Sequence, residues 1–190
     1  IIEVQGDLPN GTDAVTALDL NDPIFEIGVT PNRGDCLSVR GIARDLTAKG
    51  VGTLKSLNIK KATSEEFESP ISWSIQNDGN SCSFVVSRYY KDIKNSVSPE
   101  WLQKKLLSIG LRPINALVDI TNFITMDLGR PLHVFDADKI GNQLNMRLSN
   151  DQEKLLALDN KEYLLNDTTT VIADNKNPLA IAGIIGGNDS

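Results

Sequence analysis

The chain has 190 residues, of which 40% are hydrophobic, and its 19 basic and 25 acidic residues give a formal net charge of −6. This length and composition fit one globular domain, or one domain with a smaller neighbour. No apolar run approaches the ~20 residues that a membrane-spanning helix needs. No lysine- or arginine-rich run marks a surface that binds nucleic acid by neutralising phosphates. We therefore expect any nucleic-acid partner to be bound mainly by other parts of a longer protein.

The single histidine and the two cysteines, Cys36 and Cys82, cannot supply the four ligands of a zinc cluster at known spacings. Neither cysteine belongs to a C-x-x-C pair. A reduced cytosolic setting is the simple interpretation, and a Cys36–Cys82 disulfide is the less favoured alternative. The chain does not begin with methionine, and it stops directly after an apolar stretch, so we expect both ends to be cut from a longer chain.

In the first third of the chain, alternating apolar residues predict a half-buried strand over 24–30. A helix with one apolar face follows, beginning near Val39, with Asp35 as its candidate cap and Gly50 at its end. The polar stretch 63–69 places a boundary near residue 62.

Beyond this boundary, alternation predicts a strand over 71–75, and a more continuous apolar run predicts another over 84–93. Ser98 and Pro99 are a typical cap and first-turn pair for a helix that Gly110 closes.

A second helix is predicted from Asn115 to about Asp127, stopped by a glycine and a proline. The pattern from Leu144 onward indicates strands, which include a hairpin signal. The predicted strands are 155–158, 163–165, 170–173 and 180–185. The fold class is therefore α+β, with mixed sheets and a helical pair.

Polar residues in the middle of the second predicted helix are the first candidates for chemistry. Thr121 and Asn122 are mediocre helix formers, and Asp119 shares a face with Asn122. A solvated helix face explains them, but the apolar flanks leave little room for one, and polar groups among apolar neighbours need partners. A bound ligand is one such partner.

His133 lies in the apolar segment 130–136. A hydrogen-bonded core histidine and a ligand-holding histidine both fit this position. Gly186 and Gly187 end an apolar run, where they form either a simple turn or a place where a ligand approaches the backbone. Asp136 and Asp138 are helix caps or surface charges. The chain has neither a nucleophile elbow nor a phosphate-binding glycine loop.

Together these segments resemble a known family. Segments 110–113, 118–123 and 129–136 are similar to the B3/B4 region of the bacterial phenylalanyl-tRNA synthetase β subunit. Further matches follow or precede them in the family's order: 158–160, 171–174 and 182–187 downstream, and 30–38 and 41–44, which resemble the B1 segment, upstream. Gly34 departs from the family's usual residue.

The resemblance implies three parts. Residues 1–22 correspond to the tail of an OB-type B2 domain, 23–62 to a B1-like segment, and 63–190 to a B3/B4-like domain truncated at its C-terminus. The implied activity is editing, the hydrolysis of tRNA(Phe) wrongly charged with tyrosine. Such a site is needed because an apolar phenylalanine pocket rejects an added hydroxyl by only about 10²-fold.

The resemblance also implies a pocket. Arg112 and His133 would hold the terminal ribose and the acyl ester, and Thr121 and Asn122 would bind the amino acid or a water. Gly186 or Gly187 would form a wall with free backbone N–H groups. In this family the attacking water is positioned by the site and by the tRNA, so no catalytic residue is assigned. The acidic residue that reads the tyrosine hydroxyl is expected beyond Ser190.

The implied partners are the acceptor end of tRNA(Phe), tyrosine as the editing ligand and the synthetase α subunit, within a cytoplasmic heterotetramer that does not involve a membrane. The stretch itself needs no cofactor, whereas the parent enzyme uses ATP and Mg²⁺ to attach phenylalanine. One alternative is a non-catalytic module of the same subunit that has a structural role or positions tRNA. A free-standing small-molecule hydrolase is a third interpretation, which the upstream B1-like segment disfavours.

Overall fold

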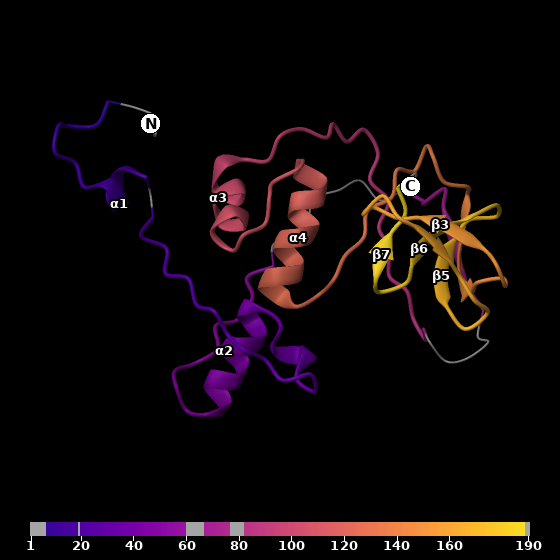
Figure 1. Ribbon diagram of the computed structural model, residues 1–190, viewed down its shortest axis with the longest axis horizontal. Helices are drawn as coiled ribbons and strands as arrows, with labels where there is room; N and C mark the ends of the chain where they lie inside the picture. The colour runs from indigo at the N-terminus through magenta and orange to yellow at the C-terminus, as the bar shows by residue number, and fades with distance from the viewer. Residues whose placement is uncertain (1–6, 19, 60–66, 77–81, 189–190) are drawn as a thin grey trace. The chain divides into compact units, whose positions relative to one another are not determined.

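The computed structural model describes residues 7–18, 20–59, 67–76 and 82–188 (Figure 1). They form two compact units, each built from two separate stretches of chain. The helical unit comprises Ile1–Leu54 and Asn95–Arg130, and the sheet unit comprises Lys55–Lys94 and Pro131–Ser190. The predicted α+β class is confirmed. The expected boundary near residue 62 lies outside the described residues, and the three-part division stays a prediction.

The helical unit is centred on a packed pair of helices. Its elements are α1 (Ala14–Ala17), the 3-10 turn η1 (Gly34–Cys36), α2 (Val39–Ala48), α3 (Glu100–Ser108) and α4 (Ala116–Leu128). On α3, Leu102 and Leu106 are each 1% exposed. Trp101 on α3 meets Phe123 on α4 edge to face, with ring centroids 5.6 Å apart. The predicted helical pair is thus confirmed (Figure 1).

The start of α2 differs from its prediction. The capping side chain is Ser38, whose hydroxyl accepts the Gly41 N–H at 2.9 Å. Asp35 instead lies in η1, where it accepts from Arg33 Nε at 2.9 Å and from Arg44 Nη2 at 2.8 Å. Two guanidinium groups bind a carboxylate more strongly than a backbone amide does, so Asp35 is held in an ion-pair network and does not cap the helix.

The sheet unit contains a mixed five-stranded sheet in the order β1-β2-β5-β6-β7 and a separate β3-β4 hairpin. Strand β1 runs parallel to β2, and the other paired strands are antiparallel. The strands are β1 (Ser72–Ile75), β2 (Gln143–Leu148), β3 (Lys154–Leu156), β4 (Glu162–Leu164), β5 (Thr170–Ala173), β6 (Pro178–Ile181) and β7 (Ile185–Gly186). All four residues of β6 are buried, so β6 lies at the centre of the core.

Three strand predictions need correction. Segments 24–30 and 84–93 form no strand in the described part of the chain, and Phe25 and Phe84 are 78% and 77% exposed. An apolar pattern becomes a strand only when a neighbouring strand completes its hydrogen bonds. The run 180–185 is two strands, because the chain turns at Gly183, which has a φ of 72°. Among the described residues, no helix is long and apolar enough to cross a membrane.

Candidate functional site

The six expected pocket residues are divided between the two units. Arg112, Thr121 and Asn122 belong to the helical unit. The sheet unit contains His133, Gly186 and Gly187. Within each unit the local structure shows which of these side chains are available for a ligand.

Arg112 is exposed in the loop between α3 and α4. The two candidates on α4 differ in what they offer. Thr121 is half-buried, and its hydroxyl donates to the Val118 carbonyl at 2.7 Å, so it can serve a ligand only as an acceptor. Asn122 is also half-buried, and its side chain makes no hydrogen bond within the part of the chain that the structure describes. Its amide therefore remains free to bind a ligand or a water.

Asp119 does not belong to a solvated face with Asn122. It has no exposed surface, and its carboxylate accepts from the Ser98 hydroxyl and, at 2.9 Å, from the Ile114 backbone N–H. The prediction that Ser98 caps α3 is wrong: the cap position is Pro99, and no side chain caps the helix. The acidic residue in the first turn of α4, flanked by Val118 and Ile120, was the sequence signal for the buried contact between Asp119 and Ser98.

His133 lies beside Phe135 in the sheet unit, with ring centroids 4.3 Å apart and an interplanar angle of 60°. The residue as a whole is exposed, although Phe135 and Gly186 cover part of the ring. Burial by the surrounding protein lowers the pKa of the imidazole below its usual value of 6.5. The ring is therefore neutral near pH 7, with one nitrogen as donor and the other as acceptor. Within the described ranges, no cluster of three or more potential ligands is arranged to hold a metal ion.

Gly186 is the member of the glycine pair that contacts His133. A Cβ atom added at Gly186 would overlap His133 Cε1 and would lie 3.2 Å from both ring nitrogens. The imidazole thus occupies the space that a side chain would need, and this close approach requires glycine.

Gly187 has a different role. A Cβ atom there would lie 2.6 Å from the Leu179 carbonyl oxygen and 3.0 Å from Leu155 Cδ1. Its backbone N–H already donates to the Leu179 carbonyl at 2.7 Å, so it is not free to bind a ligand, contrary to the expectation. The neighbouring Asn188 N–H donates to the Leu156 carbonyl at 2.9 Å. Gly187 therefore joins the β3-β4 hairpin to β6.

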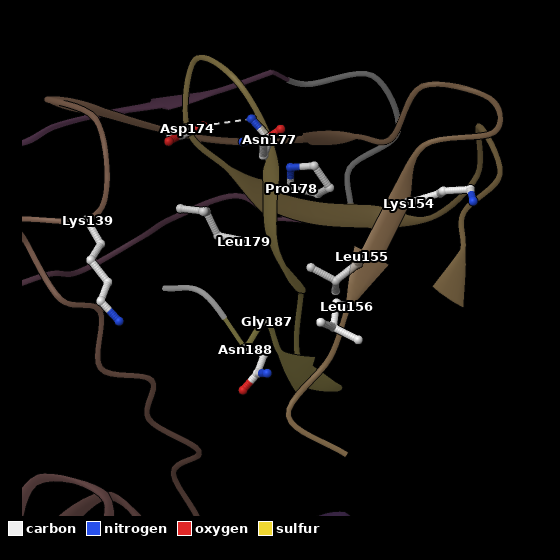
Figure 2. A pocket seen from close by; sticks show the side chains of 10 residues that line it. All are labelled: Lys139, Lys154, Leu155, Leu156, Asp174, Asn177, Pro178, Leu179, Gly187 and Asn188. Carbon is white, nitrogen blue, oxygen red and sulfur yellow. Dashed lines mark hydrogen bonds between the residues drawn. The ribbon is translucent and has the colours of Figure 1, made fainter. Parts of the chain in front are cut away.

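A pocket of about 310 Å³ lies beside β3 and β6 (Figure 2). Of the six expected residues, only Gly187 lines it. The lining consists of Lys139, Lys154, Leu155, Leu156, Asp174, Asn177, Pro178, Leu179, Gly187 and Asn188. Two of its three charged groups already have protein partners: Lys154 pairs with Glu162 at 2.7 Å, and Asp174 accepts the Lys176 and Asn177 amides at 2.7 Å each. The sequence held no signal for this pocket because its walls come from separate segments.

The chain belongs to the B3/4 domain family, whose sequence pattern matches residues 81–190. Over its full length the chain is 50% identical to the phenylalanine–tRNA ligase beta subunit of Brucella melitensis. It is 49% identical over its full length to the beta subunit of Nitrobacter winogradskyi and 47% identical to that of Mesorhizobium japonicum. The chain spans about a quarter of these relatives, 24% of the Brucella protein and 23% of the other two. The resemblance read from the motifs is thereby confirmed.

Proposed function

We propose that this chain carries the editing site of a phenylalanine–tRNA ligase β subunit and hydrolyses Tyr-tRNA(Phe). The observation that carries the proposal is the neutral His133 imidazole packed on Gly186, within a segment that belongs to the B3/4 domain family. A neutral imidazole that is accessible to solvent can form hydrogen bonds with an ester or a ribose hydroxyl, and it carries no charge that would bind anions from solution.

In the proposed reaction, a water attacks the carbonyl carbon of the tyrosyl ester. The bond between that carbon and the ribose oxygen breaks, and the ribose oxygen takes up a proton that the water loses. The products are free tyrosine and uncharged tRNA(Phe). Asn122 is suited to bind the amino acid or the water because its amide has no partner among the described residues.

The roles of Thr121 and Arg112 are assigned from the hydrogen-bonding groups that each has available for a ligand. Thr121 would accept a hydrogen bond from the substrate's ammonium group, because its own hydrogen is engaged by Val118. Arg112 would bind the negatively charged acceptor end, since it is exposed in its loop. No side chain is assigned as a general base, and the proposal leaves the orientation of the water to the pocket and the tRNA.

The proposal extends to the longer protein. In it, an α subunit would assemble with the β chain in the cytoplasm, and regions outside this stretch would use ATP and Mg²⁺ to attach phenylalanine to tRNA(Phe). The names of the relatives, all of them ligase β subunits, support this extension.

The test uses the complete β subunit that contains this chain, assembled with its α subunit, and measures tyrosine release from Tyr-tRNA(Phe). We expect His133→Ala and Asn122→Ala each to slow release by about 10²-fold, the loss typical of one positioned polar group. Phenylalanine attachment should stay unchanged. Asn175→Ala is the matched control, because Asn175 is exposed in the turn between β5 and β6. Wild-type rates in both pocket variants would overturn the assignment.

The same measurement separates the alternative, a non-catalytic module that positions tRNA. On that hypothesis, His133→Ala and Asn122→Ala would weaken tRNA binding and lower the rate of phenylalanine attachment. The complete wild-type enzyme would release tyrosine from Tyr-tRNA(Phe) no faster than the ester hydrolyses without enzyme.

A further inference from the structure

Asp119 is a fully buried carboxylate that the proposed function does not use. It lies one turn into α4, and both of its oxygens are engaged. Oδ2 accepts from the Ser98 hydroxyl, and Oδ1 accepts from the Ile114 backbone N–H at 2.9 Å. Burying a carboxylate is unfavourable unless hydrogen bonds satisfy it, so this arrangement is expected to be tightly specified.

The contact with Ile114 fixes the loop that carries Arg112. Arg112 is joined to Ile114 through Pro113, whose ring restricts the backbone between them. On the other side of Ile114, the Asn115 side chain caps α4 by accepting the Val118 N–H at 3.1 Å. The loop is therefore tied to the first turn of α4 at two successive residues.

The contact with Ser98 connects the Asp119 carboxylate to the segment before α3. The Ala116 N–H donates to the Ser96 carbonyl at 2.8 Å, and the Gln103 side chain donates to the Ser98 carbonyl at 2.6 Å. Asp119 thus joins three parts of the helical unit: the start of α3, the loop at 111–115 and the start of α4.

We infer that Asp119 is a positioning residue for Arg112, holding the loop so that the guanidinium meets the tRNA acceptor end from a fixed backbone. This inference rests on the proposed function. It predicts that the hydrogen bonds of Asp119 matter more than its charge. An asparagine can accept from the Ile114 N–H with its carbonyl oxygen and donate to the Ser98 oxygen with its amide.

The experiment is a double-mutant cycle in the assembled enzyme, with KM and kcat for tyrosine release from Tyr-tRNA(Phe) as readouts. We expect Asp119→Ala and Arg112→Ala each to raise KM about tenfold, and the double variant to raise it no further, because both changes remove the same positioned group. When Asp119→Ala is combined with His133→Ala, the two losses in kcat/KM for tyrosine release should instead multiply. Asp119→Asn should stay within about twofold of wild type. If the Asp119→Ala, Arg112→Ala double variant instead shows the product of the two single increases in KM, the inference is overturned.

A second readout does not depend on editing. Hydrogen exchange over 111–115 should quicken at least tenfold in Asp119→Ala and should stay near wild type in Asp119→Asn. Unchanged exchange in Asp119→Ala would overturn the inference even if the enzyme edits. Faster exchange in an enzyme that releases no tyrosine would overturn the proposed function and leave the link between Asp119 and the loop standing. If Asp119→Ala does not fold, Ser98→Ala serves in both measurements, because it removes one of the two partners.

Discussion

At the scale of single residues, the adjacent glycines Gly186 and Gly187 face different neighbours. The space beside Gly186 is filled by the His133 ring, a side chain that can shift. The space beside Gly187 is bounded by the Leu179 carbonyl, which the sheet holds in place. Two identical residues in sequence therefore carry different penalties for the same substitution.

The residue-scale prediction compares Gly186→Ala with Gly187→Ala. We expect Gly186→Ala to displace the His133 ring, slow tyrosine release and change the imidazole NMR signals, with little change in melting temperature. Gly187→Ala should lower stability by about 1–3 kcal/mol, as overpacking against fixed atoms does. Thermal unfolding and NMR titration of His133 measure both effects. A displaced imidazole in Gly187→Ala but not in Gly186→Ala would contradict the division of roles.

At the scale of elements, a paired arginine and glutamate fix the turn between β2 and β3. Arg147 binds Glu153 with two hydrogen bonds, at 2.9 and 2.7 Å, and Glu153 also accepts the Asn150 N–H at 2.9 Å. The two side chains are only 15% and 13% exposed. The Arg147 guanidinium lowers the pKa of Glu153, so the carboxylate is favoured in the folded state.

We expect Glu153→Gln to lower the free energy of unfolding at pH 7 by roughly 1–3 kcal/mol, because it leaves a partly buried guanidinium without its charged partner. Because the folded-state pKa of Glu153 lies below the unfolded value, the pair stabilises fully above that value, about pH 4.3, and the contribution fades as the pH falls through the folded-state pKa. Denaturant unfolding between pH 7 and 3 should therefore show the two proteins converging on acidification.

The control for this prediction is Glu162→Gln. Lys154 and Glu162 form an ion pair at 2.7 Å, but their side chains are 61% and 58% exposed. Exposed pairs contribute about 0–1 kcal/mol. Equal losses in the two glutamine variants would show that burial of the Arg147–Glu153 pair adds nothing.

At the scale of the whole molecule, net charge limits what the chain can bind unaided. A formal charge of −6 gives it little attraction for the phosphates of tRNA. The chain covers only about a quarter of its relatives, 24% of the Brucella protein. Under the proposed function, we therefore expect regions of a β subunit outside this stretch to provide most of the tRNA binding.

We therefore expect the 190-residue chain alone to edit Tyr-tRNA(Phe) with a KM at least tenfold above that of the assembled enzyme. Lowering the salt concentration should reduce this difference in KM only slightly, because the chain offers few contacts between basic side chains and tRNA phosphates that low salt could strengthen. Steady-state deacylation at two salt concentrations measures this. Efficient turnover by the chain alone would contradict it.

Local patterns in the sequence were enough to predict several elements. Asn115 and Gly129 mark the two ends of α4, since a cap and a left-handed glycine act on the adjacent turn of backbone. The hairpin around 157–161 and strands β1 and β5 were also predicted correctly, because their alternation and turn residues act over a few positions. The motifs in their order were enough to identify the family.

Contacts between distant segments could not be predicted in this way. Ser98 has a typical capping sequence, but its hydroxyl donates to the buried Asp119, 21 positions away, and α3 begins after Pro99 with no side-chain cap. Phe25 and Phe84 have strand-like neighbours but remain exposed, with no neighbouring strand among the described residues. Gly186 contacts His133 and Gly187 contacts Leu179 because the sheet brings those chains together. A local pattern depends on the backbone within a turn or a strand, whereas these partners are set by packing, which reading along the chain does not reveal.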